Sequence, residues 1–445
     1  MAAVIWLTDL SRSQADTAGA KAANLGELTR AGLPVPAGFV VGADAYLDAM
    51  EEGGVGEELR ALHTVALGQV DEPVALARTA ERLRSLVRKA GFPSRLGDEV
   101  IEAYHRLGPD RPVAVRSSAL GEDGETASFA GMHDSYTNVI GDSAVLARVV
   151  DCWVSLFGER VIAYRAACAI GGEPAIAVMV QQFVPADCAG VMFTADPATG
   201  QRDRTIIEAS YGLGEVVMAG ELEPDRYVVT NDGPRVLEVD IGDKTHKAVA
   251  TGDGTVARVD VPPADVRRQA VSDTRIIALV RSALAAEDAL GGDPQDIEWA
   301  IVDGSTYLLQ SLPITTLGAL SESHGQEAGG LVLVRGLAAA PGTATGRVRI
   351  LMSPEHWRCM EPGEVLVAAM TNPEWAPAVR RAGALVTDGG GLTCHGAIVA
   401  RELGVPCVVG TASPPADCPT DRSSPSPADR GWCWTWRLHD NEHGE

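Results

Sequence analysis

The chain has 445 residues, 46% of them hydrophobic and 22% charged, which excludes disordered and collagen-like proteins and predicts two or three folded domains. Its 37 Lys and Arg against 60 Asp and Glu leave a net charge of −23, which argues against a general nucleic-acid-binding or anionic-membrane surface. No apolar run approaches the roughly 20 residues of a membrane span, no secretory signal opens the chain, and the eight cysteines form no CxxC pair. These features predict a protein of the reducing cytoplasm.

Residues 1–316 alternate short β-type runs with helical patterns, which is typical of an α/β or α+β architecture. The clearest apolar runs lie at residues 38–41, 113–115 and 177–180. Residues 317–330 are small and polar without a sustained period, so we interpret them as a linker between two domains.

Two segments of the first domain carry cations suited to nucleotide phosphates. Lys21 precedes a short helix that Gly32 and Pro34 end, and a lysine beside a helix N-terminus suits phosphate; a solvated surface lysine is the alternative. Arg116 ends an apolar strand before a loop rich in Gly, Ser and Thr, which fits a flap over phosphates; a structural ion pair is the alternative for Arg116. No Walker A or Rossmann motif is present, so a P-loop or dinucleotide fold is not indicated.

A third segment, residues 296–315, is predicted to form a hairpin with Glu298 and Gln310 on facing strands. Mg²⁺ prefers a few protein oxygens together with substrate oxygens. The carboxylate and amide oxygens of this hairpin therefore form a candidate Mg²⁺ site.

Residues 331–411 are predicted to form a small mixed domain. The expected elements are strands at residues 347–351, 364–368, 384–387 and 405–409 and helices at residues 374–382 and 395–403, the last ended by Gly404. Residues 412–445 switch to Pro, Ser and Asp with three tryptophans and no apolar periodicity. Two interpretations of this tail stay open, a disordered end or a shifted reading frame.

The most informative segment surrounds His395, which follows the glycines at 389–391 and is expected in the first turn of a helix with Thr393 as N-cap. The positive helix end disfavours the imidazolium, leaving a neutral nucleophile, and free N–H groups there can hold a phosphoryl group. An ordinary surface histidine is the alternative. Cys394 is interpreted as a packing residue beside the histidine, because the motif offers no acid or base for a second nucleophile.

The order Thr393-Cys394-His395 resembles the phosphohistidine signature of the phosphoenolpyruvate-utilising enzymes, which include phosphoenolpyruvate synthase, pyruvate phosphate dikinase and rifamycin phosphotransferase. Residues 371–375, 183–197 and 208–225 also look like segments of the synthase and the dikinase. The resemblance implies an ATP-grasp nucleotide-binding domain over residues 1–316, followed by a swivelling β/β/α phosphohistidine domain.

The same resemblance implies roles for eight residues. In chain order they are Lys21 and Arg116 at the ATP phosphates, Gly131 and Ser135 in the flap, Gln182 near the adenine, Glu298 and Gln310 at Mg²⁺ and ATP, and His395 as the carrier of the phosphate. The sequence departs from the family at Leu312, where a phosphate-binding arginine is expected.

The implied reaction is a dikinase transfer in which ATP gives AMP, phosphate and phosphohistidine, and the phosphoryl group then passes to pyruvate. The barrel that binds pyruvate in the synthase is expected to be missing from this chain, since little sequence follows residue 411. The alternatives are a rifamycin-type enzyme or one whose acceptor domain is a separate chain, an inactive nucleotide-binding fragment, and a phosphohistidine carrier without net turnover. No nucleic-acid or membrane partner is expected.

Overall fold

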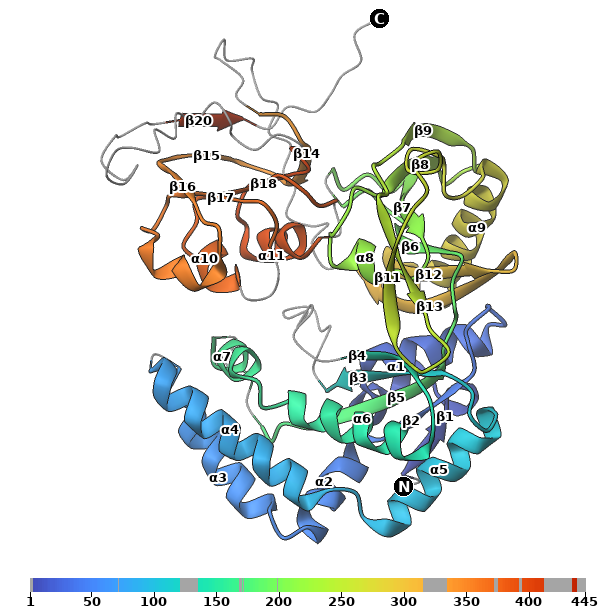
Figure 1. The fold of residues 1–445 in the computed structure, drawn as a ribbon, viewed down its shortest axis with the longest axis vertical. Coiled ribbons are helices and arrows are strands. Elements are labelled where there is room, and N and C mark those ends of the chain that lie inside the picture. Colours follow the sequence, from blue (N-terminus) through green and yellow to red (C-terminus); the bar gives the residue numbers. More distant parts are fainter. Residues whose placement is uncertain are drawn as a thin grey trace, which may run out of the picture. The chain divides into compact units, whose positions relative to one another are not determined.

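The computed structural model shows a mixed α/β fold, as the sequence predicts (Figure 1). None of the helices it describes is long and apolar enough to cross a membrane. The described residues are 3–70, 72–120, 135–167, 170, 172–197, 199–314, 334–371, 375–391, 394–411 and 434–437.

The chain forms two compact units, each built from three segments. Unit 1 comprises Met1–Asp187, Ala248–Arg258 and Ser282–Pro313, and unit 2 comprises Cys188–Lys247, Val259–Arg281 and Ile314–Glu445. The chain passes between units within β10 (His246–Ala250), β11 (Val256–Asp260) and α9 (Asp273–Ala289).

An antiparallel sheet forms the centre of unit 1. Its strands, in spatial order, are β1 (Val4–Trp6), β2 (Gly38–Val41), β5 (Ile176–Gln182), β3 (Val113–Ala119) and β4 (Ser135–Val139). β2 is buried throughout, which explains its continuous apolar sequence. Helices α1 (Ala15–Arg30) and α6 (Asp142–Ser155) both contact β3 and β5.

The predicted hairpin is confirmed in unit 1, as β12 (Gln295–Val302) and β13 (Ser305–Pro313). Asp303 and Gly304 join the two strands, and both have positive φ, of 49° and 80°. A two-residue Asp-Gly turn with this backbone matches the right-handed twist of the flanking strands.

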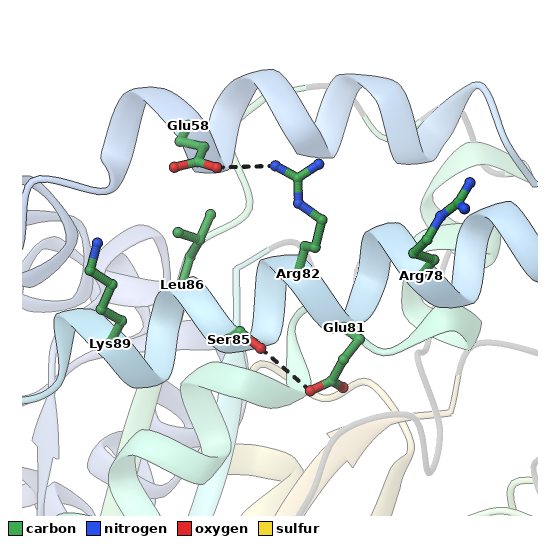
Figure 2. Close-up of a pocket in the computed structure, with 7 residues that line it drawn as sticks. All are labelled: Glu58, Arg78, Glu81, Arg82, Ser85, Leu86 and Lys89. Carbon is green, nitrogen blue, oxygen red and sulfur yellow. Dashed lines mark hydrogen bonds and ion pairs between the residues drawn. The ribbon is translucent and has the colours of Figure 1, made fainter.

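The remaining helices of unit 1 surround this core. They are the 3₁₀ helices η1 (Leu7–Asp9) and η2 (Arg12–Gln14) and the α-helices α2 (Ala43–Glu52), α3 (Gly56–Leu67), α4 (Pro73–Ala90), α5 (Ser94–Leu107) and α7 (Glu159–Ala167). A surface groove of about 500 Å³ lies along α3 and α4, where Arg82 Nη2 pairs with Glu58 Oε1 at 3.3 Å (Figure 2). Its lining is Glu58, Arg78, Glu81, Arg82, Ser85, Leu86 and Lys89, which includes none of the predicted site residues.

Unit 2 contains an antiparallel meander and a buried ion pair. The meander runs through β6 (Cys188–Phe193), β7 (Arg204–Tyr211), β8 (Asp225–Thr230) and β9 (Val236–Asp240), with the short helix α8 (Glu215–Met218) after β7. Lys244 and Asp225 pair with both side chains fully buried. Asp225 also accepts hydrogen bonds from the N–H groups of Gly242 and Ala270, so the buried carboxylate is well satisfied.

A second sheet of unit 2 is mostly parallel. In spatial order it contains β14 (Leu337–Ala340), β19 (Cys407–Val409), β18 (Ala384–Thr387), β17 (Val365–Ala368) and β16 (Val348–Ile350). Only β14 pairs antiparallel. The helices are η4 (Pro354–Cys359), α10 (Ala376–Val379) and α11 (His395–Leu403).

The predicted boundaries in this domain are mostly accurate. The predicted helix at residues 395–403 is α11, and Gly404 ends it in the left-handed conformation at φ 64°. The helix predicted at 374–382 is shorter, because α10 covers only Ala376–Val379. The predicted linker, 317–330, lies outside the described residues.

One strand lies within the tail that follows residue 411. β20 (Trp434–Arg437) pairs antiparallel with β15 (Thr343–Gly346), so Trp434 is opposite Gly346 and Trp436 is opposite Ala344. Two of the clustered tryptophans therefore occupy alternate positions of a strand, a spacing that suits β-structure.

His63 on α3 provides a pH-dependent contribution to stability. Its side chain is 6% exposed and meets Phe157 edge-on, with ring centroids 6.1 Å apart. Its Nε2 has no hydrogen-bond partner among the described residues. Burial, assisted by the nearby positive charge of Arg165, lowers the pKa of His63 from 6.5 to about 4.

We therefore predict that acid destabilises the protein through His63. Because the pKa is lower in the folded state, the unfolded chain takes up the proton first; this contribution is complete above pH 6.5 and is lost as the pH falls towards 4. The loss should reach about 3 kcal/mol. In His63→Leu, the difference in urea-unfolding free energy between pH 7 and pH 4 should shrink by about that amount. The matched control is the exposed His105→Gln, and an equal change in both variants contradicts the prediction.

Candidate active site

Arg116 and Glu298 join the central sheet of unit 1 to the hairpin. Arg116 is the one residue of β3 that is not buried, and its Nη1 bonds Glu298 Oε2 at 2.9 Å. Both side chains are less than one-fifth exposed. Arg116 Nε is buried without a hydrogen-bond partner among the described residues. The ion pair considered for Arg116 is thus present, and the guanidinium retains a donor for a further acceptor.

Gln310 is the direct cross-strand partner of Glu298. Directly opposed residues of an antiparallel pair lie on the same face, so the carboxylate and the amide lie on neighbouring positions. A register shift between Glu298 and Trp299 follows, and Trp299 is fully buried. Leu309 of β13 is the extra residue of this bulge, because Glu298 pairs with Gln310 and Trp299 pairs with Leu308.

Lys21 lies within α1 and not before it, which corrects the sequence-based placement. α1 is interrupted at Gly19, whose φ of 76° and ψ of 156° are not helical, so Lys21 is in the first turn after the break. A Cβ on Gly19 would lie 2.1 Å from Ser118 Oγ, and that hydroxyl accepts a hydrogen bond from Ala22 N–H at 3.3 Å. The break therefore creates a second helix N-terminus against the end of β3.

Ser135 completes the group on the sheet side. It is the first residue of β4, is exposed, and pairs directly with Arg116. Gly131, predicted in the same flap, lies outside the described residues.

Sequence reasoning missed two buried contacts, one that joins α1 to the hairpin and one that joins the two strands of the hairpin. Asn24 donates its side-chain amide to the Ser311 carbonyl at 2.9 Å, and Ser311 Oγ donates to Gln295 Oε1 at 2.9 Å. They hold β13 between Gln310 and Leu312. Asn24, a polar residue amid the buried face of α1, was the available sequence signal.

Gln182 is not in this group. Its cross-strand partner on β3 is Val113, whereas Arg116 pairs with Met179, so about 10 Å of strand separates the two positions. Gln182 Nε2 donates to the carbonyl of Leu107, the last residue of α5, at 3.2 Å.

No group of three or more His, Cys, Asp or Glu side chains in the described residues could hold a metal ion. Glu298 offers up to two carboxylate oxygens and Gln310 offers one amide oxygen, in addition to backbone and solvent. This donor set fits Mg²⁺, which is commonly held by one or two protein side chains together with substrate phosphates and water.

The predicted helix position of His395 is confirmed in unit 2, since α11 begins at this residue. The N-cap is Cys394, with extended backbone and no side-chain capping bond, which corrects the choice of Thr393. Cys394 is 1% exposed, and burial raises the pKa of its thiol. It belongs to the hydrophobic core, as expected for a packing residue and not for a nucleophile.

The three glycines before this helix each have a different neighbour. A Cβ on Gly389 would lie 2.7 Å from Met370 Cε, one on Gly390 would lie 2.8 Å from Cys394 Sγ, and one on Gly391 would lie 2.4 Å from an oxygen of Glu208. Of the three, only Gly390 has positive φ, at 103°. The glycine run is therefore required mainly by close packing against protein side chains.

Thr371 is a further residue that sequence reasoning left without a role. It is 1% exposed, and its Oγ1 has no hydrogen-bond partner among the described residues. A Cβ on Gly396 would lie 2.4 Å from this hydroxyl, so Thr371 contacts the first turn of α11. The segment that it opens, residues 371–375, was the available sequence signal.

The comparisons with known proteins agree on one family. Residues 15–329 match the family described as "Pyruvate phosphate dikinase, AMP/ATP-binding domain", and residues 360–420 match "PEP-utilising enzyme, mobile domain". The chain is 41% identical to a "Probable phosphoenolpyruvate synthase" of Archaeoglobus fulgidus, over 92% of this chain and 55% of the relative.

Two further relatives carry the same name in their descriptions. A "Probable phosphoenolpyruvate synthase" of Methanothermobacter thermautotrophicus is 42% identical, over 92% of this chain and 60% of the relative. The "Phosphoenolpyruvate synthase" of Pyrococcus furiosus is 37% identical, over 91% of this chain and 55% of the relative. The chain thus spans little more than half the length of these relatives, and it belongs to the family of pyruvate phosphate dikinases and phosphoenolpyruvate synthases.

Proposed function

We propose that this chain binds ATP with Mg²⁺ in unit 1 and transfers a phosphoryl group to His395, as the nucleotide-binding and phosphohistidine part of a dikinase. The observation that carries the proposal is the convergence of Arg116, Glu298 and Gln310, with a buried donor of Arg116 left without a partner among the described residues. A cation and two oxygen ligands on adjoining elements suit a metal-bound polyphosphate.

Each residue of this group has a distinct role in the proposal. Lys21, at the restarted helix in α1, and Arg116 neutralise the phosphates, while Ser135 contributes a hydroxyl from β4. Glu298 and Gln310 would hold Mg²⁺, which would withdraw negative charge from the phosphates. Gln182, about 10 Å along the sheet, is at a suitable separation for the adenine end of ATP.

His395 is the proposed nucleophile. At the first position of α11, the positive helix end favours the neutral imidazole, and the free N–H groups of the first turn stabilise the anionic phosphoryl group. ATP, water and His395 together yield AMP, inorganic phosphate and phosphohistidine. One phosphate of ATP stays in AMP, one leaves as inorganic phosphate with the oxygen of water, and one becomes bonded to a nitrogen of His395. Positioning and charge stabilisation account for most of the catalysis in such a transfer.

We further propose an ATP-grasp fold for the nucleotide-binding region, a swivelling role for the domain that contains α11, and a cytoplasmic location. We propose pyruvate as the acceptor of the phosphoryl group. The names of the relatives support this choice. An acceptor domain on a separate chain, or a small-molecule acceptor as in rifamycin phosphotransferase, would use the same first half-reaction.

An inactive nucleotide-binding fragment is the second candidate function, and Leu312 is the observation that favours it. Leu312 is partly exposed on β13, two residues beyond Gln310, and its cross-strand partner is Asp296. A family arginine at this position would add a bidentate phosphate contact. Without it, phosphate binding relies on fewer cations.

We predict that the chain becomes labelled when it is incubated with Mg²⁺ and ATP carrying label in its β and γ phosphates. The label should be acid-labile and base-stable, as expected for phosphohistidine, and should form together with AMP. His395→Ala should lose at least 99% of it while binding ATP with unchanged affinity, because His395 acts as the nucleophile. Absence of both label and AMP in the wild type would favour the fragment.

We also predict that Leu312→Arg increases the rate of labelling. A charge-assisted contact of about 1.5 to 3 kcal/mol corresponds to an increase of about tenfold or more. Leu312→Gln is the matched control, since it adds polarity without charge. If the arginine variant labels no faster than the glutamine variant, the missing cation does not limit this reaction.

A further inference from the structure

Asn138 is a buried polar residue with left-handed backbone on β4. It is 1% exposed, and its φ is 54°, which makes it one of three residues other than glycine with positive φ in the described part of the chain. Side chains with a Cβ seldom adopt this conformation, and Asn and Asp adopt it most readily. The proposed function gives Asn138 no role, although it lies three residues from Ser135 on the same strand.

Asn138 lies where the register between β3 and β4 shifts. At one end of the paired stretch Val113 is opposite Val139. At the other end Arg116 is opposite Ser135, so three steps along β3 correspond to four steps along β4. β4 therefore contains one extra residue, which is a β-bulge, and a left-handed residue is typical of such a bulge.

This bulge decides which residue of β4 stands beside Arg116. Directly opposed residues of an antiparallel pair lie on the same face of the sheet, and a slip by one residue exchanges the faces. An unshifted ladder continued from the Val113–Val139 pair would place Tyr136 opposite Arg116. Ser135 would then belong to the other face. The bulge is thus the reason that Ser135 belongs to the candidate site.

The side chain of Asn138 ties the bulge to a turn that is distant in sequence. Its Nδ2 donates to the carbonyl of Thr251 at 2.9 Å and to that of Thr255 at 2.6 Å. Residues 251–255 join β10 to β11 and belong to unit 1, as β4 does. A Cβ on Gly254 would lie 3.2 Å from the Asn138 carbonyl oxygen, so the turn also packs against the backbone of the bulge.

Asp253 orders this turn although it is exposed. Its Oδ1 accepts hydrogen bonds from Thr251 Oγ1 at 2.6 Å, from Thr255 Oγ1 at 2.8 Å and from Thr255 N–H at 3.2 Å. The N–H of Thr251 donates to the Thr255 carbonyl at 2.9 Å. These bonds fix the two carbonyls that receive the amide of Asn138.

We propose that Asn138 is a positioning residue, which fixes the bulge of β4 and so holds Ser135 beside Arg116 in the register that binds the phosphates of ATP. This inference rests on the proposed function. Two hydrogen bonds made by a buried amide favour the bulged register over the unshifted one, in which the amide would lose its acceptors. The turn at 251–255, which contains no predicted site residue, thereby becomes part of the support of the site.

The test measures the Kd of ATP by calorimetry with Mg²⁺ for the full chain and three variants, Asn138→Ala, Ser135→Ala and the double variant. Each single substitution should raise the Kd by roughly fivefold to tenfold, because each removes the contact of one hydroxyl with phosphate. If Asn138 acts through Ser135, the double variant should bind within about twofold of the weaker single variant. Independent effects would multiply, to roughly 25-fold or more.

Asn231→Ala is the matched control. Asn231 lies in unit 2, and its Nδ2 also donates to two carbonyls, those of Thr194 and Arg202, both at 2.9 Å. Its loss should leave the Kd of ATP within about twofold of the wild type. Hydrogen–deuterium exchange of residues 135–140 without ATP should increase about tenfold in Asn138→Ala and stay unchanged in Asn231→Ala.

The outcomes separate this inference from the proposed function. Wild-type affinity in Asn138→Ala, a multiplicative double variant, or an equal loss in Asn231→Ala overturns the inference and leaves the proposed function intact. A wild-type chain that does not bind ATP overturns both.

Asp253→Ala provides an independent test if Asn138→Ala fails to fold, because the substituted residue is exposed. It removes the hydrogen bonds that order the turn, so the Kd of ATP should rise about threefold. Asp232→Ala, which removes an acid from an exposed turn of unit 2, is its control. Equal affinities in these two variants would show that the turn does not support the site.

Discussion

The ion pair between Arg116 and Glu298 links two parts of unit 1 that lie far apart in the sequence. Arg116 belongs to the central sheet, and Glu298 belongs to a hairpin that begins more than 170 residues later. Breaking the pair would leave one charge of a largely buried couple without its partner, which is costly. Because Ser135 and Gln310 are the cross-strand neighbours of these two residues, the same interaction sets the relative positions of four candidate side chains.

Local sequence signals were sufficient for much of the fold. The hairpin has an Asp-Gly turn between strands of β-type residues, and α11 is ended by Gly404, so both elements were predicted from nearby residues alone. The break in α1 at Gly19 was not predictable in this way, because its cause is Ser118, almost 100 residues away.

In the candidate site, too, some residues were predictable from the local sequence and others were not. Residue types and spacing identified Arg116, Glu298 and Gln310, and their resemblance to a known family supplied roles that remain proposals. The neighbours that hold them, Asn24 and Ser118, bear no motif, since a single hydrogen bond to a distant carbonyl or amide leaves no periodic signal. The neighbours that require the glycine run before α11 were not predictable from its local sequence, because two of the three, Met370 and Glu208, are distant in the chain.

Unit 1 is built from three segments that are separated in the sequence, and this affects how it folds during synthesis. The hairpin with Glu298 is the last part of this unit to leave the ribosome, after the whole meander of unit 2. Until then Arg116 is without Glu298, although all five strands of the central sheet have already been synthesised. Domains usually fold as units during synthesis, but here unit 1 must wait for about 110 residues that include the whole meander of unit 2. Its folding is therefore dominated by contacts that are distant in sequence, which slow the search for the native state.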